Sequence, residues 1–364
     1  MSFREYRPMK QAPLPQKRRP VIGIALGAGV ARGWTHIGVL RRLAEAGIEP
    51  DIISGTSIGA LVGGCEAAGK LDVLEDFARS LTRRRMLSLL DFRFRASGLI
   101  GDAKLREIMH THLAGLNIED MDRRFVGVAT ELTTGHELWL HEGGLIDSIR
   151  ASYALPGVFS PVSIDGRWLI DGALVNPVPV SVARALGAHV VIAVNLNNDP
   201  FDPSGRARHV GRQPEPYYRS PEAARSDDDL LEELEEELEE EERRKGIRQN
   251  GEGEPDSMSE RIYDMLFGWS RKNNEEMELM KKVVGRESPR EPGIASVMLA
   301  SLNIVTDRVG RMRMASDPPD VMIAPRVAHL SLLDFDHAEE LIARGEAAAE
   351  EALSHIREAI ELAR

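Results

Sequence analysis

The sequence Asp51-Ile52-Ile53-Ser54-Gly55-Thr56-Ser57-Ile58-Gly59 joins a short apolar run to a G-x-S-x-G motif, and a stretch rich in small residues, 60–68, follows it. The apolar run predicts a strand, and the small-residue stretch predicts a helix that ends before Gly69. A serine on the sharp turn between a strand and a helix is typical of a nucleophile elbow, where the hydroxyl projects from the strand end. Gly55 and Gly59 would let the helix pack against the strand without a side-chain clash. An ordinary glycine-rich connection is the alternative.

A second strand–loop–helix unit precedes this motif. Residues 21–26 form an apolar run that is typical of a strand buried on both faces. A glycine-rich loop, 27–33, comes next, and apolar residues at helical spacing then predict a helix that Gly47 ends. The order strand, loop, helix, strand, loop, helix indicates a βαβ unit and therefore an α/β fold with a parallel sheet.

Further elements follow along the chain. Residues 126–130 and 137–140 predict the two strands of a hairpin around Thr133-Thr134-Gly135, and residues 167–170 predict a short strand that ends at Asp171. We expect the remaining helices at 146–154, 177–186, 262–284, 295–314 and 336–364, and the remaining strands at 189–194 and 320–325.

The composition excludes several classes of protein. The chain has 364 residues, a formal net charge of −12 and one cysteine, Cys65. One cysteine excludes an intramolecular disulfide and a multi-cysteine zinc site, so we expect a reducing compartment. The acidic balance argues against nucleic acid as a partner. However, residues 221–245 hold 13 acidic and 4 basic residues, a net charge of −9, so the excess belongs mainly to one segment.

These changes in composition divide the chain. We expect a disordered basic tail at 1–20, the first part of the catalytic domain at 21–198, an acidic, mobile insertion at 199–257, and a mainly helical remainder of the same domain with one late strand at 258–364. The chain is therefore predicted to be one domain interrupted by a charged arm.

A nucleophilic serine needs an oxyanion hole and a base. The backbone N–H groups of the loop 27–33 are candidates for the hole, because this loop also follows a strand and precedes a helix. The alternative, a dinucleotide loop of the pattern G-x-G-x-x-G, would need glycine at the position of Arg32. For the base, Asp171 ends a strand at a sharp turn, where a desolvated carboxylate can accept the serine proton, although an aspartate that caps a turn looks the same. A histidine base is the other option, but none of the histidines stands in a distinctive setting; we considered His36, His136 and His141.

Three motifs together resemble the patatin-like phospholipase family, above all its bacterial single-domain members, and are similar to the catalytic domain of neuropathy target esterase. These motifs are the glycine-rich loop with Arg32, the G-x-S-x-G serine, and Asp171-Gly172-Ala173, which begins 114 positions after Ser57. The resemblance covers residues 21–196 and resumes at 302–325. It implies a patatin-like three-layer α/β fold, with a central, mostly parallel sheet and helices on both faces. Ala151-Ser152 with Pro156 and Phe159, and Asn176-Pro177, also look like family features.

The resemblance also implies a site. Ser57 would be the nucleophile and Asp171 the base of a dyad without histidine, acting on carboxylic esters of lipids such as phospholipids or lysophospholipids, with no metal or organic cofactor. Ala28 and Val30 depart from the glycines of many members; a donor amide needs no particular side chain, but a β-branched residue rarely adopts a positive φ. The oxyanion amides would come from Gly29, Val30 and Arg32, and the motif-supporting residues would be Gly27, Gly33, Gly55, Gly59, Gly172 and Ala173.

Residues 81–100 interleave arginines with large apolar residues, a pattern that suits contact with anionic lipid, although a packed helix with solvated arginines is the alternative. We therefore expect a cytoplasmic protein that takes a lipid ester substrate and lies peripherally on the inner membrane surface. A catalytically weak regulatory or scaffold protein that acts through its acidic insertion is the other functional class, and a dinucleotide-dependent oxidoreductase is the third.

Overall fold

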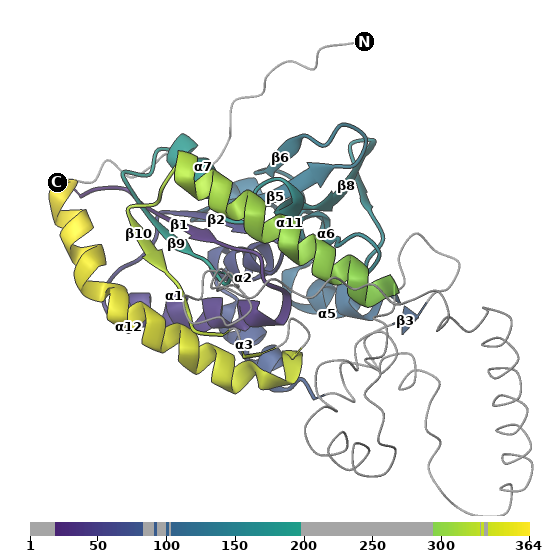
Figure 1. Cartoon of the computed structure of the whole chain (residues 1–364), viewed down its shortest axis with the longest axis horizontal. Helices are drawn as coiled ribbons and strands as arrows, with labels where there is room; N and C mark the ends of the chain where they lie inside the picture. Colours follow the sequence, from purple (N-terminus) through teal and green to yellow (C-terminus); the bar gives the residue numbers. More distant parts are fainter. Residues whose placement is uncertain are drawn as a thin grey trace, which may run out of the picture.

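The computed structural model describes residues 19–82, 91–92, 100–101, 103–197, 294–327, 329–330 and 334–364 (Figure 1). The acidic insertion expected at 199–257 and the helix expected at 262–284 lie outside these residues. So do residues 1–18 of the expected tail and most of the arginine-rich stretch 81–100. From that stretch the structure describes residues 81–82 and the residues of two short antiparallel strands, β3 (Asp91–Phe92) and β4 (Ile100–Gly101), the second of which ends one residue beyond it.

An eight-stranded sheet forms the centre of the described residues, in the order β10-β9-β1-β2-β5-β8-β7, with β6 paired to β5. Strands β10, β9, β1, β2 and β5 run parallel to one another, whereas β6 and β8 pair antiparallel with β5, and β7 pairs antiparallel with β8. This confirms the predicted central, mostly parallel sheet and the predicted hairpin. The strands are β1 (Ile22–Leu26), β2 (Ile52–Thr56), β5 (Arg124–Glu131), β6 (Glu137–Leu140), β7 (Val162–Ile164), β8 (Arg167–Asp171), β9 (Val190–Val194) and β10 (Val321–Ile323).

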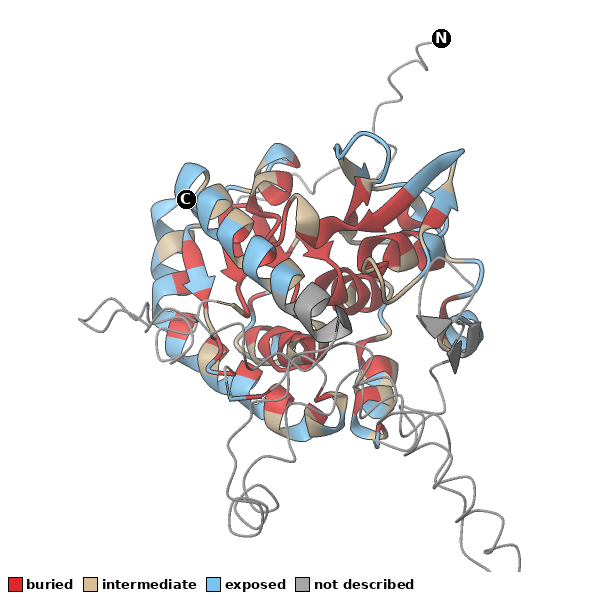
Figure 2. Cartoon of the chain, turned by 45° about the vertical axis from the view of Figure 1, so that its right-hand side comes forward, coloured by how far each residue is buried: buried red, intermediate tan, exposed pale blue. Residues whose placement is uncertain are grey.

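Both faces of the sheet are covered, as the apolar run of β1 predicts. Ile22, Ile24 and Leu26 pack into one apolar cluster, and the alternate residue Ala25 packs into a second cluster on the opposite face. Helices α1 (Thr35–Glu45), α2 (Ile58–Ala67), α6 (Leu145–Tyr153) and α12 (Ala338–Leu362) contribute to the first cluster. Helices α7 (Val180–Ala185) and α11 (Ile294–Ser316) contribute to the second. Figure 2 shows the buried strands among these helices; the outer face of α12 is exposed, whereas α2 is buried.

Shorter helices complete the first layer and the loops at the sheet edge. Helices α3 (Leu71–Arg79) and α5 (Ala103–Leu113) extend the first cluster beside α2. The described 3-10 turns are η1 (Val30–Trp34), η2 (Ile118–Asp120), η3 (Gly172–Leu174) and η6 (Phe335–His337).

The helix expected at 177–186 begins three residues later, at Val180. The carbonyl oxygen of Pro177 accepts a hydrogen bond of 2.9 Å from the backbone N–H of Ala28 and is therefore turned toward the glycine-rich loop. The proline correctly predicted a helix here, but the predicted first residue was wrong, because this tertiary contact holds residues 177–179 outside the helix.

Helix α12 packs closely against α1 at two glycines. A Cβ atom added to Gly38 would lie 2.0 Å from the carbonyl oxygen of Ile342, and one added to Gly345 would lie 2.0 Å from that of Thr35. Two helix backbones approach this closely only where both lack side chains, so each glycine is required by its partner helix.

We predict that Gly38→Ala lowers the free energy of unfolding by about 1–3 kcal/mol, because the added methyl forces α1 and α12 apart. Chemical denaturation monitored by circular dichroism would measure the change. Gly310→Ala is the matched control, because Gly310 lies inside α11 and its added Cβ would make an ordinary 3.7 Å contact with Pro177. Alanine favours a helix over glycine, so this variant should gain about 0.5–1 kcal/mol in free energy of unfolding. Equal stability of Gly38→Ala and wild type would contradict the packing argument.

Candidate active site

Ser57 lies on the turn between β2 and α2, with φ of 58° and ψ of −123°. This conformation is rare for a residue with a side chain, and it is the strained geometry that a nucleophile elbow requires. The flanking glycines explain how the turn fits. A Cβ atom on Gly59 would lie 2.1 Å from the carbonyl oxygen of Leu26, and one on Gly55 would lie 2.4 Å from that of Gly59. The structure therefore shows the strand–turn–helix context that the motif predicts.

Ser152 holds the backbone of the elbow. The N–H of Ser57 donates to Ser152 Oγ at 2.9 Å, and Ser152 Oγ donates to the carbonyl oxygen of Val128 at 2.5 Å. Ser152 is fully buried, so both of its hydrogen bonds are protected from water. Sequence reasoning noted Ser152 only as a family feature, and no spacing rule links it to a turn 95 positions away.

Asp171 contacts Ser57 directly. Ser57 Oγ donates to Asp171 Oδ2 at 2.7 Å, and the two residues are 7% and 1% exposed. The second carboxylate oxygen, Oδ1, accepts the backbone N–H of Ala173 at 2.8 Å. The Asp171 backbone is held as well: its N–H donates to Ala154 and its carbonyl accepts the Thr130 hydroxyl. The structure thus brings the two predicted dyad residues together across 114 positions.

The topology of the sheet explains why Ser57 and Asp171 lie side by side. Along β5, Thr56 of β2 lies opposite Val128, and Asp171 of β8 lies opposite Ala129. Strand β6 occupies the other edge of β5 at the same residues, so β2 and β8 must share one edge and approach each other end to end. Gly172 lets the chain turn there, because a Cβ atom on it would lie 2.2 Å from the carbonyl oxygen of Val128.

Burial sets the charge state of Asp171. Desolvation raises its pKa to about 6 from the ordinary 3.8, while the hydrogen bonds from Ala173 and Ser57 favour the charged form and limit the rise. Near neutral pH the group is ionised but basic enough to accept a proton. This is the electrostatic setting that suits a general base.

The glycine-rich loop lies beside the elbow. A Cβ atom on Gly33 would lie 2.2 Å from Ile58, the residue after Ser57. Gly27 and Ala28 donate their N–H groups to the carbonyls of Val194 and Pro177, which anchor the start of the loop. Val30 adopts φ of 51°, although a β-branched residue rarely does, so the loop keeps the shape that a glycine would allow.

The three predicted oxyanion amides differ in their surroundings. The N–H of Arg32 donates to the carbonyl of Gly29 at 3.1 Å within a tight turn. No hydrogen-bond acceptor for the amides of Gly29 and Val30 is found among the described residues. The Arg32 guanidinium donates twice to the carbonyl of Leu330, at 3.0 and 2.8 Å. Of the three predicted amides, those of Gly29 and Val30 are therefore the ones without an acceptor in the described ranges, and the Arg32 side chain fastens the loop to the C-terminal segment.

His36 lies beneath this loop and is fully buried. Its Nε2 atom is 2.8 Å from the carbonyl oxygen of Gly27, so Nε2 carries the proton that is donated. Burial lowers the pKa of His36 to about 4, which keeps the ring neutral. His36 is thus a packed histidine, and the sequence pattern did not reveal that it supports the loop.

A partly buried polar network supports the other side of the elbow. Thr56 donates its hydroxyl to the carbonyl of Asn176, and the Asn176 amide donates to Glu137 at 2.8 Å. Arg313 of α11 donates to the same carboxylate at 2.7 Å. Helix α11 is in this way linked to the strand end that carries Ser57. Within the described ranges, no group of three His, Cys, Asp or Glu side chains could hold a metal ion.

Comparison with known proteins agrees with this geometry. The sequence model of the patatin-like phospholipase family matches residues 24–184. An uncharacterised NTE family protein of Mycobacterium tuberculosis is 32% identical over 340 residues, which cover 92% of this chain and 91% of that protein. A patatin-like phospholipase domain-containing protein of Caenorhabditis elegans is 38% identical over 184 residues, 49% of this chain and 14% of the relative. Human patatin-like phospholipase domain-containing protein 6 is 32% identical over 184 residues, 49% of this chain and 13% of the relative.

The family match begins at Ile24 in β1 and includes the glycine-rich loop, the elbow and Asp171. The mycobacterial relative extends the similarity over nearly the whole chain. The sheet order and the two helix layers agree with the fold that the motifs imply. This chain therefore belongs to the patatin-like phospholipase family and is an enzyme of the lipid ester hydrolase class.

Proposed function

We propose that the protein is a serine acyl-hydrolase that cleaves carboxylic esters of phospholipids or lysophospholipids with a Ser57–Asp171 dyad. The observation that carries this proposal is the 2.7 Å hydrogen bond from the strained, buried Ser57 to the buried Asp171 carboxylate. A serine hydroxyl that donates to a desolvated carboxylate is prepared for nucleophilic attack.

The reaction proceeds in two steps. Ser57 Oγ attacks the ester carbonyl carbon while Asp171 Oδ2 takes its proton, and the oxyanion accepts hydrogen bonds from the amides of Gly29 and Val30. When the C–O bond breaks, the alkoxide of the leaving lysolipid or alcohol takes that proton from Asp171. Water then attacks the acyl-enzyme as Asp171 accepts one of its protons. Release of the fatty acid returns this proton to Ser57 Oγ.

A lipid substrate implies contact with a bilayer. The arginine-rich stretch 81–100 would face anionic lipid, and the protein would act peripherally from the cytoplasmic side, a reducing compartment that suits its single cysteine. No helix in the described part of the chain is apolar over a length that would cross a bilayer.

The first test is covalent labelling with a fluorophosphonate probe, which reacts with an activated serine. We expect labelling of wild type at Ser57, and loss of both labelling and ester hydrolysis, by about 10³-fold or more, in Ser57→Ala. Ser163→Ala, an exposed serine of β7, is the control and should behave as wild type. A folded wild-type protein that neither labels nor hydrolyses phospholipids, lysophospholipids or simple esters would instead support a regulatory or scaffold role.

The second test uses Asp171→Asn, which keeps the shape of the side chain but removes the base. We expect kcat to fall by about 10²–10⁴-fold, as for loss of a general base. Hydrolysis at an undiminished rate would exclude Asp171 as the base.

Above pH 6, Asp171→Asn should also have a larger free energy of unfolding than wild type. The raised pKa of Asp171 means that the folded state binds more protons than the unfolded state between pH 3.8 and about 6, so the ionised aspartate lowers stability above that window. We expect Asp171→Asn to gain up to about 3 kcal/mol at pH 8, a gain that disappears as the pH falls to 4. Asp122→Asn, at an exposed loop position, is the control for denaturation curves at both pH values. A gain that does not depend on pH would reject the burial argument.

The pH dependence of hydrolysis provides a third test. Because Asp171 must be ionised to act, kcat/KM for an uncharged ester should rise about tenfold per pH unit below pH 6 and level off above it. A flat profile between pH 5 and 8 would place the essential ionisation elsewhere.

A further inference from the structure

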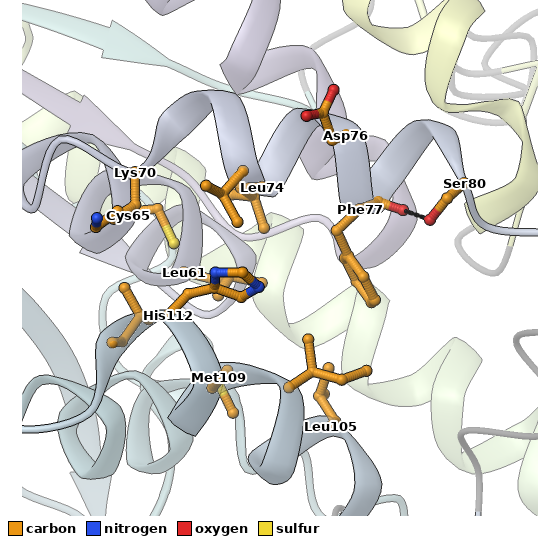
Figure 3. A pocket seen from close by; sticks show the side chains of 13 residues that line it. Leu61, Cys65, Lys70, Leu74, Asp76, Phe77, Ser80, Leu105, Met109 and His112 are labelled. Atoms are coloured by element: carbon orange, nitrogen blue, oxygen red, sulfur yellow. Dashed lines mark hydrogen bonds between the residues drawn. The ribbon is translucent and has the colours of Figure 1, made fainter.

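We propose that the apolar pocket between α2, α3 and α5 binds the fatty acyl chain of the ester that Ser57 attacks. This proposal rests on the proposed function and adds where the chain lies and which substrates are preferred. The pocket has a volume of about 450 Å³, within the range of sites that enclose small ligands. Figure 3 shows Leu74 and Phe77 of α3 on one side and Leu105 and Met109 of α5 on the other.

Helix α2 connects the pocket to the nucleophile. Leu61 and Cys65, which line the pocket, lie four and eight residues after Ser57 on the same helix. The N–H of Leu61 donates to the carbonyl of Ser57, so Leu61 is one turn along from it. At 1.5 Å per residue, these side chains lie about 6 and 12 Å along the helix axis. Residues four apart share a face, so Leu61 and Cys65 lie on one face of α2, and their side chains tilt toward the helix end at which Ser57 lies.

The chemistry of the walls favours an alkyl chain over a polar ligand. The buried residues that line the pocket are apolar: Leu61, Cys65, Leu74, Met109 and Leu113. Burial raises the pKa of the Cys65 thiol to about 12, so this side chain is a neutral, apolar part of the wall and not a second nucleophile.

The polar lining residues lie toward the outside of the pocket. Asp76 and His112 are exposed, and Lys70 and Ser80 are half-buried. The Ser80 hydroxyl already donates to the carbonyl of Phe77 at 2.6 Å, as Figure 3 shows. An apolar interior with a few polar groups at its outer edge matches a pocket that takes an alkyl chain.

An acyl pocket produces a selectivity that can be measured. Each methylene transferred from water to an apolar wall strengthens binding about fourfold. The enzyme should therefore prefer long acyl chains, and filling the pocket should remove that preference without disturbing the dyad.

Two substitutions fill the pocket from facing helices. Val73 of α3 and Ile108 of α5 both line it and are half-buried, so a larger side chain can enter the space without replacing a core residue. Val73→Trp and Ile108→Trp change helix propensity little. His110→Trp is the matched control, because His110 is exposed on α5 and does not line the pocket. Ile108→Phe serves where a tryptophan variant fails to fold.

The experiment measures kcat/KM of the full chain for p-nitrophenyl esters from acetate to palmitate. We expect the filled variants to hydrolyse acetate and butyrate within about threefold of wild type and to lose at least about tenfold on palmitate, as expected when several methylene contacts are lost. The control should retain the wild-type profile. An unchanged chain-length profile in folded filled variants, or an equal loss on every ester, would overturn the acyl-pocket proposal while leaving the dyad intact.

A binding measurement separates this proposal from the catalytic one. Ser57→Ala should bind the fluorescent fatty acid cis-parinaric acid, with displacement by palmitate, and Ser57→Ala/Ile108→Trp should lose this binding at least tenfold. Fatty-acid binding that persists in the double variant would reject the pocket. Binding that is lost on filling, in a protein that hydrolyses no ester, would support the pocket and reject the proposed reaction.

Discussion

The candidate active site depends on one edge of strand β5 that β2 and β8 share. Strands β2 and β8 arrive along this edge from opposite directions, and their ends face adjacent residues, Val128 and Ala129. Backbone hydrogen bonds to β5 fix the positions of both strands. The serine after β2 and the aspartate at the end of β8 therefore lie at hydrogen-bond distance. Side chains positioned by paired strands are held more firmly than side chains on free loops. The antiparallel end of a mostly parallel sheet is thus what brings Ser57 and Asp171 together.

Around this edge the protein holds several unfavourable features. Ser57 and Val30 have positive φ values, and a carboxylate is buried where its charged form is costly. Each would relax if its neighbours could move. They cannot, because Gly55, Gly59 and Gly172 allow backbones to pack in direct contact, and because Ser152 fixes the elbow amide. Close packing therefore maintains a conformation that local preferences disfavour.

The C-terminal residues 294–364 that the structure describes support the candidate site as well as the fold. Helix α12 packs against α1, which follows the glycine-rich loop. The carbonyl oxygen of Leu330 accepts two hydrogen bonds from the Arg32 guanidinium in that loop. On the opposite face, α11 reaches the site through Arg313, Glu137 and Asn176. The family match ends at residue 184, yet the sheet is completed by β9 and β10 beyond it. This agrees with a relative that is similar over nearly the full chain.

The sequence by itself determined the local elements and the type of chemistry. Apolar runs and glycine spacing predicted β1, β2 and the elbow, because each depends on residues close together in the chain. Local patterns do not specify which distant carbonyl fixes a backbone. Tertiary structure alone decided that Ser152 holds the elbow, that His36 supports Gly27, and that Pro177 stays outside α7. It also decided how the glycine-rich loop is held, because the N–H of Arg32 donates within its own turn and the Arg32 side chain donates to a carbonyl 298 positions away.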